Sequence, residues 1–203
     1  MRRRNNSGNR GGTRPAGRFR IIGGVWRGRR FSVPAAPGVR PTPDRVRETL
    51  FNWLTPVIDG ARCLDLYAGS GALGLEALSR GAARVVFVDS SAVACAAIRD
   101  ALQIVGSEAG DVRRETAESY LAGPPEAFDV VFLDPPFRQG RVEPALQRLV
   151  DGGWLRPSAL VYIETERHAA PPPGWDLLRG ATAGQVRYHL ARPEPPADGE
   201  NQK

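Results

Sequence analysis

The chain is poor in the residues that build metal centres and disulfide frameworks. Among 203 residues there are two cysteines, two histidines and a single lysine, Lys203. Cys63 and Cys95 have no Cys or His neighbour at the spacing of a zinc site, and His168 and His189 have no partner at ligand spacing. We therefore expect reduced thiols in a cytoplasmic protein and no bound metal.

Long hydrophobic runs are also missing. Apolar stretches such as Val85–Val88 and Ala159–Ile163 are far shorter than the roughly 18 residues of a membrane-spanning helix. No apolar segment follows the N-terminal arginines, so the pattern of a secretory signal is absent. A hydrophobic content of 41% is enough for one buried core. The sequence predicts one main domain with short extensions and no membrane partner.

Acidic residues are absent before Asp44, and this shapes the charge of the whole chain. The formal charge is +6, but eleven of the 28 basic residues precede Asp44. The rest of the chain therefore holds 17 basic residues and all 22 acidic ones. A basic arm on a mildly acidic body favours a polyanionic partner such as nucleic acid, with a solubilising tail as the alternative. The arm carries Arg2, Arg3, Arg4, Arg10, Arg14, Arg18, Arg20, Arg27, Arg29, Arg30 and Arg40.

Composition divides the chain into four parts. We expect disordered tails at 1–17 and 192–203, where there is almost nothing to bury. Residues 18–41 are predicted to form a β-hairpin extension with arginines beside Trp26, followed by a proline-rich linker. The domain then spans 42–191 and opens with a helix for which Thr42 is the expected N-cap.

From Arg62 onward, short apolar strands alternate with helical stretches. This order predicts an α/β fold with a mostly parallel sheet and right-handed crossovers, closed by an antiparallel hairpin. The expected strands are 63–66, 85–88, 112–116, 130–133 and 160–163, with the closing hairpin at 175–178 and 185–190. The expected helices are 72–79, 92–105, a short turn near Ser119 and 142–150.

A glycine-rich turn follows the first of these strands. Gly69, Gly71 and Gly74 have the spacing of a dinucleotide-binding loop, which brings the backbone close to a ligand. Asp89 ends the next strand, twenty residues after Gly69, where a carboxylate accepts both hydroxyls of a ribose. Asp65 before the loop suits a ligand with an ammonium group and no pyrophosphate. S-adenosylmethionine is therefore favoured over NAD.

A second motif, Asp134-Pro135-Pro136-Phe137, follows the apolar strand before it and lies at the same sheet edge as the glycine-rich turn. An exocyclic amine on a base is a weak nucleophile because its lone pair is delocalised into the ring. Acceptors at Asp134 and at the Pro135 carbonyl would bind both amine hydrogens and favour a pyramidal nitrogen. Phe137 would stack on a base that is turned out of its helix or loop. The pattern predicts methylation of an amine.

The two motifs resemble motifs I and IV of class I S-adenosylmethionine-dependent N-methyltransferases. Three further stretches, Arg20–Gly24, Arg40–Leu54 and Leu75–Gly81, resemble the RsmD family, bacterial enzymes that methylate N2 of a guanine in small-subunit (16S) ribosomal RNA. The likeness covers roughly 19–191. It implies a Rossmann-like, seven-stranded sheet with an N-terminal hairpin extension, and an assembling small ribosomal subunit as the substrate.

The resemblance also assigns site residues. The catalytic set is Asp134, Pro135, Pro136 and Phe137. Asp89 would hold the ribose of S-adenosylmethionine, and the Ala117 amide would meet the adenine. The rest of the cofactor site is assigned to Asp65, Ala68, Gly69, Ser70, Gly71 and Asp134. From the charge pattern we also predict RNA contacts at Arg20, Trp26, Arg27, Arg29, Arg30, Arg40 and Arg45.

Two other functions fit parts of the pattern. A DNA adenine-N6 or cytosine-N4 methyltransferase would use the same acid-Pro-Pro-aromatic turn, but such enzymes generally need a separate target-recognition domain, for which this chain has little room. A non-catalytic RNA-binding module on a methyltransferase fold is the other alternative. The intact motif from Asp134 to Phe137 counts against it.

Overall fold

The computed structural model describes residues 17–33, 42–137 and 139–195. Of the segments predicted to be disordered, Gly17 lies in the first strand and the last strand runs to Pro193. Glu194 and Pro195 are also described, and the Glu194 N–H donates to the Gly174 carbonyl at 3.0 Å, while residues 1–16 and 196–203 fall outside the described residues. The predicted linker at 34–41 also falls outside them, as does Arg40.

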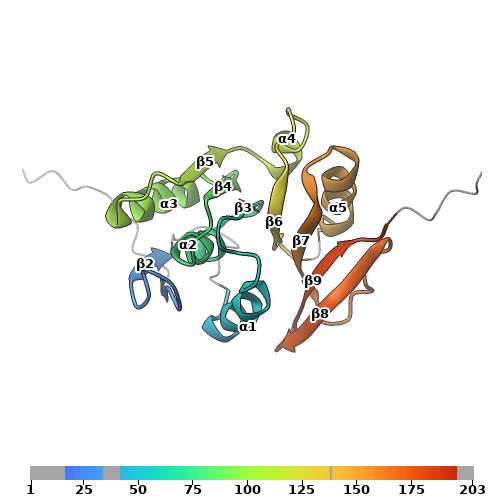
Figure 1. Ribbon diagram of the computed structural model, residues 1–203, viewed down its shortest axis with the longest axis horizontal. Coiled ribbons are helices and arrows are strands. Elements are labelled where there is room, and N and C mark those ends of the chain that lie inside the picture. The colour runs from blue at the N-terminus through green and yellow to red at the C-terminus, as the bar shows by residue number, and fades with distance from the viewer. Residues whose placement is uncertain (1–16, 34–41, 138, 196–203) are drawn as a thin grey trace, which may run out of the picture.

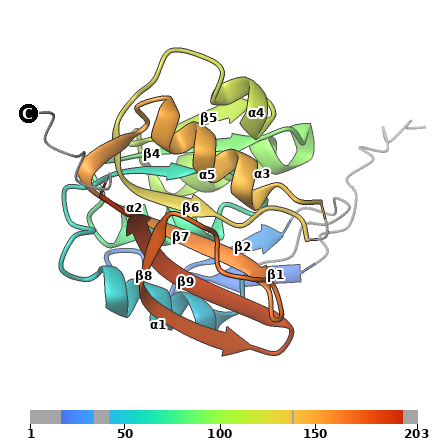
Figure 2. The same ribbon diagram turned by 90° about the vertical axis from the view of Figure 1, so that its right-hand side faces the viewer.

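A seven-stranded mixed sheet forms the centre of the molecule, with the strand order β5-β4-β3-β6-β7-β9-β8 (Figure 1). The first five of these strands are parallel to one another, and β9 is antiparallel to both β7 and β8. This arrangement confirms the predicted parallel sheet with a closing hairpin, which lies at one edge (Figure 2). The strands are β3 (Arg62–Asp65), β4 (Arg84–Asp89), β5 (Gly110–Arg114), β6 (Phe128–Leu133), β7 (Leu155–Glu166), β8 (Trp175–Ala183) and β9 (Val186–Pro193).

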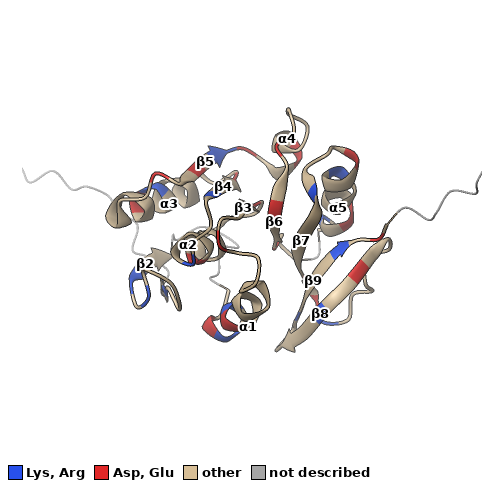
Figure 3. Ribbon diagram, viewed as in Figure 1, with Lys and Arg blue, Asp and Glu red and all other residues tan. Residues whose placement is uncertain are grey.

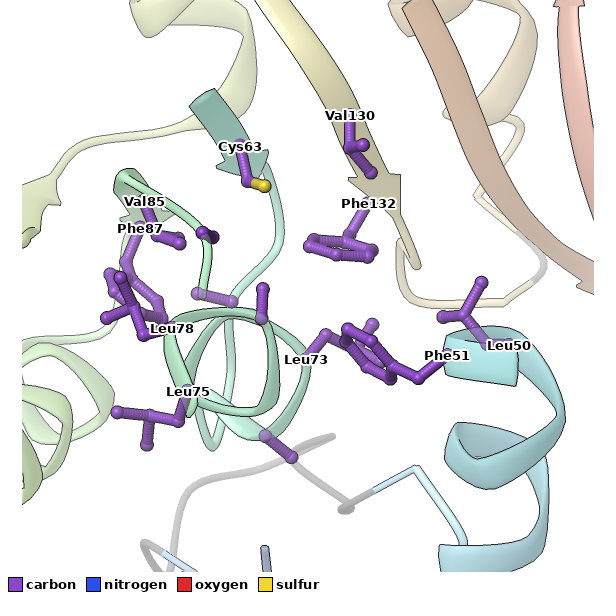
Figure 4. Close-up of a cluster of buried hydrophobic side chains, with 14 of the residues drawn as sticks. Leu50, Phe51, Cys63, Leu73, Leu75, Leu78, Val85, Phe87, Val130 and Phe132 are labelled. Carbon is purple, nitrogen blue, oxygen red and sulfur yellow. The ribbon is translucent and has the colours of Figure 1, made fainter. Parts of the chain in front are cut away.

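Helices cover both faces of the sheet, because side chains of successive strand residues point to opposite faces and both sets are apolar. One face packs against α1 (Asp44–Leu54), α2 (Ala72–Ser79) and α3 (Ala92–Val105). The other packs against α4 (Ala117–Tyr120) and α5 (Val142–Asp151). On the first face Phe51 of α1 packs against Phe132 of β6, with ring centroids 5.9 Å apart and the ring planes tilted by 45° (Figure 4).

Most elements fall where the sequence predicts them. The bounds of α2 and α3 match the prediction. The predicted strands fall within the observed ones with three exceptions: β3 ends at Asp65, one residue early, β5 ends at Arg114, two residues early, and β9 begins at Val186, one residue late. The prediction that Thr42 caps α1 is wrong. Pro43 occupies the cap position with no side-chain cap hydrogen bond, and the Thr42 carbonyl accepts from Nε of the buried Arg47 at 3.0 Å.

The predicted N-terminal hairpin is present as a separate two-stranded sheet of β1 (Gly17–Arg20) and β2 (Arg30–Val33). Phe19 and Phe31 pair across it, and both are buried in the core beneath α1 and α2. The carboxylate of Glu76 in α2 accepts the backbone N–H groups of Ile22 and Gly23, each at 2.8 Å. The hairpin is thus docked onto the domain through a buried charge as well as through apolar contact.

No described helix combines the length and the apolar character that a membrane span requires.

Candidate active site

The predicted site residues meet at the carboxyl edge of the sheet. Asp65 ends β3, Asp89 ends β4, and Asp134 directly follows β6. Because β3 pairs in parallel with both β4 and β6, these three strand ends lie at one edge. Ligands of open α/β sheets bind at this edge, so the topology brings the two sequence motifs together.

The glycine-rich turn is a tight connection between β3 and α2. Gly69 and Gly71 both have positive φ, 53° and 74°, a conformation that favours glycine. The Ala68 N–H donates to the Val88 carbonyl at 3.0 Å, and Ala68 and Ser70 are buried. Asp89 also shapes this turn, since its Oδ2 accepts the Gly69 N–H at 2.8 Å and its Oδ1 accepts that of Ser91 at 2.8 Å. This structural use of Asp89 was not anticipated from the sequence.

Asp65 is a buried carboxyl beneath that turn, only 3% exposed. Its Oδ2 accepts the Gly74 N–H at 3.0 Å, and no described residue donates to Oδ1. Burial raises the pKa of Asp65 to about 7; the Gly74 hydrogen bond opposes this shift and the charge of Asp89 adds to it. A cation beside Oδ1 would stabilise the ionised form. The site therefore fits the ammonium group predicted for the ligand.

A carboxyl pair lies at the end of the neighbouring strands. Leu133 of β6 pairs with Ile163 of β7, which places Asp134 beside Glu164, and the two side chains are hydrogen-bonded. Burial, followed by the charge of Glu164, raises the pKa of Asp134 well above its usual range. Tyr162 Oη donates to Glu164 Oε1 at 2.5 Å. Glu164 was missed by the sequence analysis, which ended its strand at Ile163.

A cavity of about 200 Å³ opens beside this pair. Pro135, Pro136 and Phe137 form part of its wall, and Phe137 is 41% exposed. Glu164 and Thr165 contribute from the end of β7, whereas Asp134 is not among the residues that line the cavity. The wall offers an aromatic ring, two rigid prolines and a buried carboxyl to a planar ligand.

The residues predicted to contact the adenine and the RNA are spread over α4, the hairpin and α1. Ala117 is the first residue of α4, and its side chain is buried in the core. Trp26 and Arg27 lie in the hairpin turn, and Trp26 N donates to Ser79 Oγ at the last residue of α2, about 12 Å along that helix from the glycine-rich turn. Arg20 pairs with Asp44 at 3.1 Å, and Arg29 Nη1 donates to the Ile104 carbonyl. Arg27, Arg29, Arg30 and Arg45 are exposed.

The described residues include no group of three or more His, Cys, Asp or Glu side chains placed to hold a metal ion. Both cysteines are buried and free.

These features define a class of protein. A mostly parallel seven-stranded sheet, a glycine-rich turn after its first strand, an acid at the end of the second and an Asp-Pro-Pro-Phe turn after β6 are those of a Rossmann-like class I methyltransferase. The family described as conserved hypothetical protein 95 matches residues 19–192. The chain belongs to this family, the RsmD family, as its sequence resemblance predicted.

Close relatives agree with this assignment. Ribosomal RNA small subunit methyltransferase D of Escherichia coli (strain K12) is 46% identical over 204 residues, which cover 99% of this chain and 98% of the relative. The Haemophilus influenzae protein of the same name is 45% identical over 180 residues, covering 86% and 93%. A solved structure titled "Putative methyltransferase yhhF from Escherichia coli" has a TM-score of 0.81 at 47% identity, covering 89% of this chain and all of that one.

Proposed function

We propose that the chain transfers the methyl group of S-adenosylmethionine to the exocyclic N2 amine of a guanine in small-subunit (16S) ribosomal RNA, during assembly of the subunit. The observation that carries the proposal is the Asp134–Phe137 turn at the same sheet edge as the glycine-rich turn, beside a cavity of about 200 Å³. Membership of the family and the names of the relatives support rRNA as the substrate.

The cofactor site is proposed from the residues around the glycine-rich turn. S-adenosylmethionine supplies a methyl carbon bonded to a positively charged sulfur. Asp65 would bind its ammonium group, Asp89 its ribose hydroxyls and the Ala117 amide its adenine. Both oxygens of Asp89 already accept backbone N–H groups, but each retains a second lone pair for a hydroxyl. Ala68, Gly69, Ser70 and Gly71 would form the backbone cradle.

The acceptor amine is proposed to meet Asp134 and the Pro135 carbonyl. Both are hydrogen-bond acceptors, and together they would bind the two amine hydrogens and direct the nitrogen lone pair at the methyl carbon. Phe137, on the cavity wall, would stack on the base. As the new nitrogen–carbon bond forms, the bond between the methyl carbon and the sulfur would break and S-adenosylhomocysteine would leave. The positively charged nitrogen would then release a proton to Asp134 or to water. Strong general-base catalysis is not needed for this step.

RNA affinity is proposed to come from the basic hairpin and from α1. The exposed arginines there include Arg27, Arg29, Arg30 and Arg45, and no acid occurs between Gly17 and Val33. Arg20 and Trp26 are proposed to add RNA contacts on the same hairpin. Arg40, which the sequence predicts as an RNA contact, is proposed as one more. A DNA methyltransferase remains the second candidate for the same chemistry, but the described chain adds only this hairpin to the methyltransferase sheet.

The experiment offers the purified protein and S-adenosylmethionine to small ribosomal particles from a strain that lacks the homologous enzyme, and to naked 16S rRNA and DNA. Nucleosides are identified by mass spectrometry after digestion. We expect N2-methylguanosine from the ribosomal substrate. Methylated adenine or cytosine from DNA, or no methylated nucleoside at all, would contradict the proposal.

Asp134→Ala tests the role of the turn in that assay. We expect kcat to fall by about two to three powers of ten, because a stabiliser of the transition state is lost, while cofactor affinity measured by calorimetry changes less than kcat. Asp100→Ala, an exposed acid on α3, is the control and should retain normal turnover. Near-normal turnover of Asp134→Ala would remove Asp134 from the mechanism.

A further inference from the structure

Glu164 is a buried carboxyl that the proposed methyl transfer does not use. It is 5% exposed and lies in the part of β7 that β9 continues to pair, opposite Tyr188. Its side chain is hydrogen-bonded to Asp134 and accepts from Tyr162 Oη at 2.5 Å. Two hydrogen bonds therefore fix the orientation of a group that also forms part of the cavity wall.

The pair formed by Glu164 and Asp134 can carry at most one negative charge. Two carboxyls in hydrogen-bonding contact share a proton, because both cannot ionise in a site removed from water. The hydrogen bonds from Tyr162 and Asp134 favour the ionised form of Glu164 against the effect of burial, which raises its pKa. Asp65 is the other acid that acts on Asp134, and no described arginine forms an ion pair with either member. The cavity wall thus presents a fixed hydrogen-bond acceptor.

Bases differ in what lies beside their exocyclic amine. In guanine the N2 amine is next to the ring N1–H, which is a donor. In adenine the N6 amine is next to N1, and in cytosine the N4 amine is next to N3; both ring nitrogens present a lone pair. A carboxylate placed beside the group that accepts the amine therefore accepts the N1–H of guanine. The same carboxylate repels the ring lone pair of adenine or cytosine.

We propose that Glu164 determines the specificity for guanine: its carboxylate accepts the N1–H of the base whose N2 amine faces Asp134. This inference rests on the proposed function, which supplies the guanine substrate. Asp134 and Glu164 directly follow Leu133 and Ile163, the last paired residues of the parallel strands β6 and β7, and this side-by-side placement matches two adjacent donors on one edge of the base. The same arrangement disfavours the adenine and cytosine acceptors of a DNA methyltransferase.

The test replaces the target guanine with 2,6-diaminopurine in a synthetic RNA ligated into the substrate that the wild-type protein methylates. Both bases carry the N2 amine, but diaminopurine has a lone pair at N1. We expect the wild-type protein to prefer guanine by about tenfold to a hundredfold in kcat/KM. In Glu164→Gln the amide nitrogen can donate to N1 of diaminopurine, so this preference should fall at least about tenfold.

A ratio of two substrates in one preparation does not depend on the fraction of folded enzyme, and Glu48→Gln, an exposed glutamate on α1, should keep the wild-type ratio. If Glu164→Gln does not fold, the wild-type comparison still decides, since equal turnover of the two bases would overturn the inference. An unchanged ratio in Glu164→Gln would overturn it as well. Wild-type protein that produces no N2-methylguanosine would instead refute the proposed function.

Discussion

At the scale of single residues, the acids of this site differ in what surrounds them. Asp89 is half-buried and accepts two backbone N–H groups, whereas Asp65 is buried and accepts only one from the described residues. A buried carboxyl with a pKa of about 7 is only partly ionised at neutral pH. Its charge state will therefore respond to any cation that binds beside it.

Cofactor binding should release protons from Asp65. A ligand ammonium lowers the pKa of this carboxyl from about 7, so at pH 7 the protonated fraction gives up its proton on binding. Calorimetry of S-adenosylmethionine binding in two buffers of different ionisation enthalpy measures this release as a difference in observed enthalpy. Asp65→Asn should abolish the difference and weaken binding, while Asp100→Asn should leave both unchanged. Equal enthalpies in the two buffers for the wild-type protein would contradict the prediction.

The sequence indicated three of the four acids at this edge and missed the fourth for a physical reason. Asp65, Asp89 and Asp134 each end an apolar run, and such positions in a parallel sheet lie at the ligand-binding edge. Glu164 also follows an apolar run, but the strand continues through it to Glu166 because β9 supplies a partner. That pairing depends on a contact between distant segments, which no local pattern reveals.

At the scale of elements, the three stretches that resemble the RsmD family mostly serve to attach the hairpin to the domain. They are Arg20–Gly24, Arg40–Leu54 and Leu75–Gly81. Glu76 and Arg47 are both fully buried and form an ion pair at 3.3 Å; Arg80 adds a second at 2.8 Å. Arg47 Nη2 also donates to the Arg20 carbonyl and to Asp44. Residues from the three stretches thus meet in one buried network between the hairpin, α1 and α2.

Removing the charge of Glu76 should destabilise the protein. Glu76→Gln leaves the buried Arg47 guanidinium with one acidic partner fewer, and breaking a buried pair costs about 3 to 5 kcal/mol. We expect a loss near the lower end in urea unfolding, because Asp44 still contacts Arg47. Glu48→Gln, exposed on α1, should change the free energy of unfolding by less than about 0.5 kcal/mol. Equal losses in the two variants would show that the network contributes nothing specific.

Secondary structure was predicted best where the local signal is complete. The apolar spacing of α3, its Ser91 cap and its Gly106 end all lie within the segment, and its bounds matched. Thr42 is a residue type that commonly caps helices, yet its carbonyl accepts a hydrogen bond from Arg47 of the buried network. A side chain that satisfies several distant groups thus overrides a local capping preference.

At the scale of the whole molecule, positive charge is concentrated on the hairpin, with a further group at the end of β5 (Figure 3). The hairpin turn packs against the end of α2 that is remote from the glycine-rich turn. RNA bound there would extend along the face of α1 and α2 while the target base enters at the sheet edge. The charged surface would then supply affinity, and the cavity would choose the base.

The salt dependence of RNA binding should separate the two parts of the basic arm. The plot of log K against log salt has a negative slope, and each phosphate contact that is lost makes this slope less steep by about 0.7 to 0.9. Removing residues 1–16 takes away Arg2, Arg3, Arg4, Arg10 and Arg14, so at most five contacts can vanish. Replacing Arg27, Arg29 and Arg30 by alanine removes three charges from a hairpin that the Glu76 network fixes in place.

We expect the hairpin variant to lose more affinity per charge than the truncated chain, because ordered arginines give up less conformational freedom when they contact phosphate. Filter binding or fluorescence anisotropy across a salt series measures both slopes on the same RNA. The methylated nucleotide should be the same in all three proteins, since phosphate contacts carry no direct base information. Identical slopes would reduce the arm to a solubility device, and a change of methylated nucleotide on truncation would place part of the specificity in the tail.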